Sequence, residues 1–116
     1  SFYSEHIQFC DPVRKVSGFD SLKKYYSEIY ENVDSIQFQF TRFVEDKNVV
    51  FAEWIMAIQV EGLHSKKPYA VNGCSLFEFD QKNLVHYHRD YFDLGEMVYE
   101  KIPLLGFLVR TIKKKL

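Results

Sequence analysis

Two histidines and an aspartate recur at every second position near residue 90, as His86, His88 and Asp90. On a β-strand these side chains would share one face, because successive side chains point to opposite sides of a sheet. A carboxylate beside an imidazole can share one proton with it and act as an acid or a base. The same side chains could ligate a metal ion, but same-face neighbours on a strand lie about 7 Å apart and do not readily close on one ion. Among catalytic chemistries the spacing therefore favours acid–base work, and we expect no metal site.

Asp90 has two other interpretations, since it could contact a bound ligand or make structural hydrogen bonds, including a pair with an arginine. Asp11 precedes Pro12 after a short apolar segment, where aspartate is a common turn residue, so a structural role stays open for it beside a role in a pocket. Cys10 and Cys74 show neither a CxxC spacing nor an obvious activating base. We expect both cysteines to be buried free thiols in a reducing compartment.

The hydrophobic pattern predicts the strands that hold these residues. A short strand covers residues 7–9, and four long strands cover roughly residues 35–45, 49–60, 69–79 and 84–92. The turns at residues 45–48 and 80–83 are tight, which favours an antiparallel meander.

Two helices are predicted beside the strands. The first begins at Ser17, because Ser17-Gly18-Phe19-Asp20 fits a capping box and apolar residues follow at helical spacing. The second begins at Asp93 with another capping box and is interrupted at Pro103. Its apolar segment 102–116 ends in lysines and could lie on a membrane, but we favour packing on its own sheet or on a second subunit.

One face of the strand at 49–60 is wholly apolar and predicts the inside of the fold. It comprises Val50, Ala52, Trp54, Met56, Ile58 and Val60. The strands at 69–79 and 84–92 have no cleanly polar face. Their pattern alone therefore leaves open whether His88 and Asp90 point inward or outward.

The composition fits a single domain over residues 1–116, which is long enough to bury a core. A formal net charge of −1 gives no global attraction to nucleic acid. Aromatic residues make up 17% of the chain, which suits either a dense core or a cavity lined by rings. The sequence given shows no signal peptide and no membrane-spanning run, so we expect a cytoplasmic protein.

The run His88-Arg89-Asp90-Tyr91-Phe92-Asp93-Leu94 resembles the last strand of limonene-epoxide hydrolase, which carries nearly the same string. Over essentially the whole chain, the order of elements is similar to that of SnoaL-like polyketide cyclases and ketosteroid isomerase. The chain is thereby identified as a member of the nuclear transport factor 2-like superfamily. The resemblance implies an α+β fold of the cystatin-like type: a cone-shaped, strongly curved antiparallel sheet packed against helices, with a ligand in the mouth of the cone. The first long helix of the family is largely missing, and Ser1-Phe2-Tyr3 are expected to be its last turn.

The resemblance also implies a direction for the last strand. The aspartate of the hydrolase string is a catalytic carboxylate that faces the pocket, and it falls on Asp90. His86, His88 and Phe92 would then face inward as well. In the polyketide cyclases one aspartate of the final strand does acid–base work, and Asp90 can be likened to it.

The hydrolase's own catalytic set is not preserved. Its second aspartate and its arginine fall on Met56 and Trp54, and the tyrosine and asparagine that hold its water fall on Phe9 and Asp11. Epoxide hydration by that mechanism is therefore not expected. In the comparison with ketosteroid isomerase, Asp11 matches the general base and Ser75 falls on the aspartate that donates to the oxyanion.

These resemblances imply a pocket for a small apolar molecule, no cofactor, and proton transfer next to a carbonyl group, as in an isomerase or cyclase. The expected catalytic residues are Asp90 as general acid–base, Asp11 as second carboxylate and His88 as tuning neighbour. The expected substrate-binding residues are Phe9, Trp54, Met56, Ser75 and Phe92. The alternative is a non-catalytic ligand-binding or dimeric interaction protein of the same fold. A homodimer is expected in either case, without nucleic acid and without a membrane role.

Overall fold

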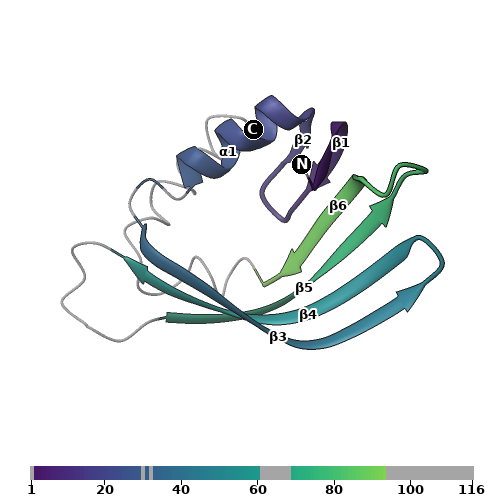
Figure 1. The fold of residues 1–116 in the computed structure, drawn as a ribbon. Coiled ribbons are helices and arrows are strands. Elements are labelled where there is room, and N and C mark those ends of the chain that lie inside the picture. The colour runs from purple at the N-terminus through teal and green to yellow at the C-terminus, as the bar shows by residue number, and fades with distance from the viewer. Residues whose placement is uncertain (1, 30, 32, 61–68, 94–116) are drawn as a thin grey trace.

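A six-stranded sheet bends around one helix in the part of the chain that the structure describes (Figure 1). This computed structural model describes residues 2–29, 31, 33–60 and 69–93. The strands lie in the order β2-β1-β6-β5-β4-β3. The elements are β1 Tyr3–Cys10, β2 Lys15–Ser17, α1 Phe19–Ile29, β3 Val33–Asp46, β4 Val49–Val60, β5 Tyr69–Phe79 and β6 Val85–Phe92. The curved α+β architecture confirms the predicted fold class.

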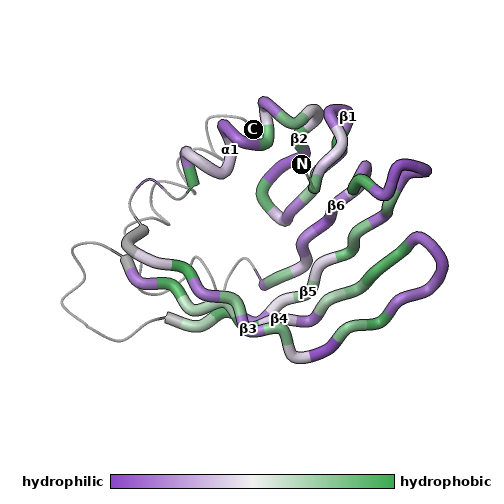
Figure 2. The backbone as a smooth tube through the Cα atoms, viewed as in Figure 1, coloured by the Kyte–Doolittle hydropathy of each residue, from purple (hydrophilic) through white to green (hydrophobic). Residues whose placement is uncertain are grey.

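The four long strands form the predicted meander, in which each strand pairs antiparallel with the next. The bounds of β4 and β5 are those read from the hydrophobic pattern. Between β5 and β6, Oδ1 of Asp80 accepts hydrogen bonds from the backbone N–H groups of Lys82 at 2.8 Å and Leu84 at 3.0 Å. Figure 2 shows that this turn and the β3–β4 turn are hydrophilic, whereas apolar residues recur along the strands.

The N-terminal segment differs from the prediction. β1 begins at Tyr3, so the expectation that this residue ends a helix is wrong. Tyr3 pairs with Val85 of β6 instead. β1 runs parallel to β6, so the sheet is mixed rather than wholly antiparallel. β2 was not predicted, and it forms because Val16 lies opposite Phe9 in an antiparallel pair. Short segments of this kind depend on a partner strand more than on their own pattern.

Helix α1 begins two residues later than the capping box suggested. The Ser17 hydroxyl donates to Oε1 of Gln8 at 2.7 Å, and among the described residues no helical N–H donates to it. Gly18 takes the turn instead, with φ of 90°, and its carbonyl accepts the N–H of Leu22 at 3.0 Å. A residue with a side chain rarely adopts this φ, which explains a glycine here.

The core lies between the concave face of the sheet and α1. Ala52, Trp54, Met56 and Ile58 are buried, which confirms the predicted inner face of β4. Helix α1 contributes Leu22, Tyr25 and Ile29 to the same apolar cluster. Figure 1 shows α1 facing this concave side of the sheet. The layer arrangement thus directs the inner side chains of β4, β5 and β6 toward a shared interior.

The predicted second helix, including Pro103 and the segment 102–116, lies outside the described residues. Within the described part of the chain, no helix is long and apolar enough to span a membrane.

Candidate functional site

A chain of hydrogen bonds crosses three neighbouring strands on the concave face. The indole Nε1 of Trp54 donates to Oγ of Ser75 at 2.8 Å, and the Ser75 hydroxyl donates to Oδ1 of Asp90 at 2.6 Å. The same Oδ1 lies 2.6 Å from Nε2 of His88. Strand register explains the grouping, because Ser75 lies directly opposite Asp90 in the β5–β6 pair. The carboxylate is therefore held by two short bonds of the charge-assisted type.

Tyr3 continues this chain on the other side of the imidazole. Its hydroxyl lies 2.9 Å from Nδ1 of His88. Burial raises the pKa of Tyr3 to about 12; a hydrogen bond from Tyr26 lowers it, and the charge of Asp90 raises it. The phenol consequently stays protonated at neutral pH and can donate to Nδ1, which places the imidazole proton on Nε2, toward Asp90. Because the phenol can also accept, the contact persists when His88 takes up a proton.

His88 is buried among aromatic rings, with only 5% of its surface exposed. The ring of Phe77 lies 4.5 Å away, that of Phe9 stands edge-on at 5.0 Å, and that of Tyr3 stacks at 5.8 Å. This packing fixes the orientation of the imidazole. The His88 imidazole thus keeps its nitrogen atoms aimed at Tyr3 and Asp90, and no side-chain entropy has to be lost to orient it when a ligand binds.

Asp90 reaches from this buried chain into a hollow of about 280 Å³, and 20% of its side chain is exposed. The hollow is lined by Tyr3, Tyr26, Phe38, Phe40, Trp54, Ser75, Phe77, His88 and Asp90. Within the described residues, Oδ2 of Asp90 accepts no hydrogen bond, whereas Oδ1 accepts two. One carboxylate oxygen is thus anchored, and the other has no donor among the described residues.

The sequence profile of the SnoaL-like domain family matches residues 1–87. The chain belongs to the SnoaL-like domain family. The match covers Trp54 and Ser75 and ends one residue before His88, so the acid–imidazole pair lies just beyond it. Among curated proteins no sequence matches this chain.

Solved structures share the fold of this SnoaL-like domain. A protein with a ketosteroid isomerase-like fold from Catenulispora acidiphila, in complex with trimethylamine, is similar with a TM-score of 0.75 and 13% identity, over 89% of this chain and 79% of that one. A SnoaL-like polyketide cyclase, so described, from Shewanella putrefaciens reaches a TM-score of 0.72 at 18% identity, over 83% and 76%. An epoxide hydrolase of the limonene-epoxide hydrolase type from M. tuberculosis reaches 0.68 at 19% identity, over 94% and 74%. At these identities the likeness shows the fold alone.

Both carboxylate oxygens of Asp11 in the SnoaL-like domain accept hydrogen bonds from the surrounding turn and from α1. Its Oδ1 accepts the N–H groups of Val13 at 2.7 Å and Arg14 at 3.0 Å, and its Oδ2 accepts the hydroxyl of Tyr25 at 2.6 Å. Burial raises the pKa of Asp11; the three hydrogen bonds lower it, and the charge of Asp90 raises it. Asp11 and Asp90 also line one shared hollow of about 440 Å³. The turn role is present, and the two carboxylates interact electrostatically.

The other predicted binding residues occupy different places. Trp54 and Ser75 are in the hydrogen-bonded chain, and Phe9 packs against His88. Phe92 packs 6.5 Å from the Trp54 ring and lines the hollow shared by the two aspartates. Met56 is 3% exposed and belongs to the apolar cluster rather than to the lining of the hollow beside Asp90.

His86 does not face inward, contrary to the expectation from the resemblance. The β5–β6 register skips it: Glu78 lies opposite Tyr87 and Phe79 lies opposite Val85. This bulge reverses the alternation, so Val85 is buried while the His86 side chain is 45% exposed and lies 3.8 Å from Glu78. Among the described residues no group of three metal-ligating side chains exists.

Sequence reasoning missed several residues of the site. Tyr3 was expected in the last turn of a helix, although it is the first residue of β1. Phe38 and Phe40 alternate with polar residues on their strand, whereas Phe77 lies on a strand without a cleanly polar face; both patterns indicated only strands. Tyr26 lies on the apolar face of α1, where a core role is the ordinary interpretation.

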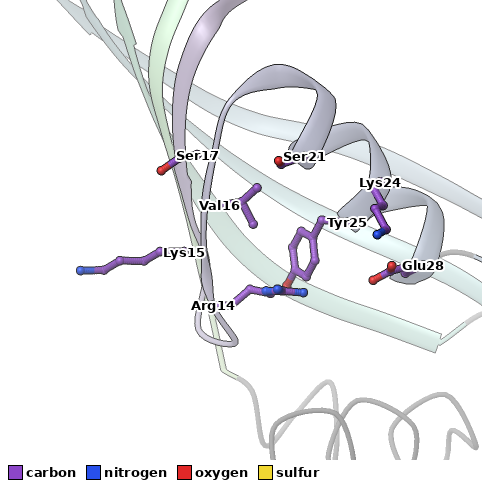
Figure 3. Close-up of a pocket in the computed structure, with 8 residues that line it drawn as sticks. All are labelled: Arg14, Lys15, Val16, Ser17, Ser21, Lys24, Tyr25 and Glu28. Carbon is purple, nitrogen blue, oxygen red and sulfur yellow. The ribbon is translucent and has the colours of Figure 1, made fainter. Parts of the chain in front are cut away.

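A separate hollow of about 360 Å³ lies between β2 and α1 (Figure 3). It is lined by Arg14, Lys15, Val16, Ser17, Ser21, Lys24, Tyr25 and Glu28. The guanidinium of Arg14 lies 5.1 Å from the centre of the Tyr25 ring. Val16 and Tyr25 are buried at its floor, and none of the lining residues belongs to the hydrogen-bonded chain around Asp90.

Proposed function

We propose that this SnoaL-like domain is a small-molecule pocket protein that catalyses proton transfer next to a carbonyl group, in the manner of an isomerase or cyclase. One observation carries the proposal. Asp90 is anchored through Oδ1 by His88 and Ser75 at 2.6 Å each, and its side chain still opens into an aromatic hollow. A carboxylate placed at an apolar wall in this way suits general acid–base work.

The proposed mechanism uses the free oxygen of Asp90. Oδ2 accepts a proton from the carbon next to the substrate carbonyl, the C–H electron pair moves into an enolate, and the proton is returned to another carbon. Ser75 and the His88 ring keep the carboxylate oriented throughout the cycle. The Tyr26 phenol lines the same hollow, but its proton is used in the hydrogen bond to Tyr3, so it takes no part in the transfer. No step requires a cofactor.

The surroundings of Asp90 support chemistry over a purely structural role. Within the described residues it pairs with no arginine, and its partners are a histidine and a serine. Asp11 lines a neighbouring hollow with it, so a second carboxylate is within electrostatic reach. The trimethylamine complex of the Catenulispora protein supports the proposal in one respect, since a domain of this fold there holds a small organic molecule.

Deuterium incorporation tests this mechanism without knowledge of the natural substrate. An apolar bicyclic ketone such as 2-tetralone, dissolved in D₂O buffer with the protein, should exchange its carbonyl-adjacent hydrogens faster than in buffer alone. The variant Asp90→Asn should lose about 10²- to 10⁴-fold of the enzymatic exchange rate, the usual contribution of a general base. Asp20→Asn, whose side chain is fully exposed on α1, is the matched control. Equal exchange by the Asp90→Asn variant and the native protein would remove Asp90 from the mechanism.

The alternative, a non-catalytic binding protein, predicts ligand binding without exchange. Mass spectrometry of compounds that co-purify with the protein would reveal such a ligand directly. A homodimer and a cytoplasmic location remain predictions that sedimentation and cell fractionation can examine.

A further inference from the structure

Among the described residues, the hollow beside Asp90 is lined by six aromatic residues and a carboxylate, and by no lysine or arginine. The aromatic residues are Tyr3, Tyr26, Phe38, Phe40, Trp54 and Phe77. Ring faces carry partial negative charge, and they attract cations that lie over them.

The walls of the hollow meet at steep angles. The Phe38 ring stands perpendicular to the Trp54 indole, with centres 5.4 Å apart and planes at 88°. Phe40 stacks beside Phe38 at 6.1 Å. Phe38 and Phe40 keep 46% and 50% of their surface exposed, although they belong to the concave side of β3. Within the described residues their faces are not covered, and a compact ligand could cover them.

Within the described residues no lysine or arginine pairs with Asp90, and its close partner His88 is cationic only when it is protonated. The hydrogen-bond donors to Asp90 are the Ser75 hydroxyl and the His88 ring, and Tyr3 donates to the other imidazole nitrogen in the neutral form. When His88 is neutral, the hollow therefore carries the negative charge of Asp90 at its polar end and ring faces along its sides. A carboxylate within an aromatic box favours an organic cation over an inorganic one, because methyl groups fill the apolar volume while the positive charge meets the rings.

We propose that this hollow binds a compact organic cation, such as a molecule bearing a methylated ammonium group. The inference rests on the proposed function in that both require a ligand in this hollow, and it specifies the class of that ligand. The ammonium methyl groups lie against Phe38, Phe40 and Trp54, and Asp90 supplies the opposite charge.

Two probes of nearly equal shape separate charge from size. Choline carries a trimethylammonium group, and 3,3-dimethylbutan-1-ol replaces its nitrogen by carbon. Isothermal titration calorimetry or NMR titration of the full chain should give binding of choline that is about 5- to 30-fold tighter than binding of the neutral alcohol, the range expected of cation–π contacts. In Asp90→Asn this preference should fall but stay above onefold, because the ring faces that attract the cation remain.

Phe38→Leu provides a second variant that preserves the polar chain and removes one ring face. It should weaken choline several-fold and leave the neutral alcohol nearly unchanged. Phe51→Leu is the matched control, because Phe51 is 43% exposed and lies on the opposite face of the sheet. Circular dichroism would verify that each variant is folded.

The outcomes separate this inference from the proposed function. Equal or tighter binding of the neutral alcohol overturns the cation inference and leaves a general pocket in place. Choline binding that survives both variants places the cation elsewhere and also overturns the inference. If neither probe binds while 2-tetralone exchanges its hydrogens, the inference fails and the proton-transfer function stands. If neither probe binds and no exchange occurs, both fail.

Discussion

Replacing Gly73 by alanine probes the contact that holds Trp54 in the site. A Cβ built on Gly73 would lie 2.3 Å from Cη2 and 2.7 Å from Cζ2 of the Trp54 indole, and 2.7 Å from the backbone oxygen of Tyr91. All three separations are far inside van der Waals contact. Gly73 lies opposite both Trp54 in β4 and Phe92 in β6, so neither neighbouring strand can easily move away.

The expected cost has two parts. Overpacking of a well-packed core typically costs about 1–3 kcal/mol. A displaced indole also loses the hydrogen bond from its Nε1 to Ser75. A hydrogen bond of this kind contributes about 1 kcal/mol to the free energy of unfolding. The free energy of unfolding should therefore fall by about 2–4 kcal/mol in Gly73→Ala.

Urea denaturation followed by fluorescence measures this directly, because Trp54 is the single tryptophan of the chain. The emission spectrum of the folded variant should also shift, since the indole is 3% exposed in the native protein. The double variant Gly73→Ala/Trp54→Phe, followed by circular dichroism, should regain part of the loss because the indole atoms in the clash are gone. A single Gly73→Ala variant with native stability and unchanged emission would refute the packing argument.

Three other perturbations address the hydrogen bonds and charges around the site. Ser75→Ala leaves the buried Trp54 N–H without its acceptor and should lower the free energy of unfolding, measured by urea denaturation, by about 1–3 kcal/mol. A loss below about 0.5 kcal/mol, which is the scale of a surface substitution, would argue against a buried donor. The folded pKa of Tyr3 is about 12 against 10.0 for the free phenol, so its contribution to stability is fully present below pH 10 and is lost as the pH rises toward 12. Tyr3→Phe should therefore flatten the fall in the free energy of unfolding over this alkaline range. An unchanged slope would contradict the assignment. The folded pKa of Asp11 is raised above 3.8, so the native protein should lose some stability as the pH rises from 3.8 up to that folded pKa. Asp11→Asn should remove this pH dependence while keeping an acceptor for the N–H groups of Val13 and Arg14. If the stability of Asp11→Asn still falls over this range, another group is responsible.

Much of the fold follows from period and turn chemistry in the sequence. The alternation along residues 49–60 and 69–79 predicted both strands with their observed bounds, because a half-buried strand needs apolar residues on one side. The hydrophilic turns predicted their antiparallel order. The resemblance at Asp90 added the fold family, which the profile match confirms.

The N-terminal strands could not be read in the same way. Tyr3 has little local signal for a strand, and β1 becomes one because its backbone pairs with β6 and β2. The helix starts at Phe19 rather than Ser17 because Ser17 pairs with Gln8 as the last residue of β2. A tertiary partner outcompeted a local cap in that case.

The sequence by itself determined which residues are apolar, where strands alternate and where turns occur, since these depend on neighbours a few positions apart. It also supplied the string around Asp90, and with it the family. Tertiary structure alone decided which side chains meet. The bulge at His86 turns that histidine outward while His88 stays buried, and only the paired strands reveal it. The approach of Tyr3 to His88, 85 positions apart in the chain, likewise requires the parallel pairing of β1 with β6. Contacts of such sequence separation are fixed by the packing of the whole sheet, which no local pattern encodes.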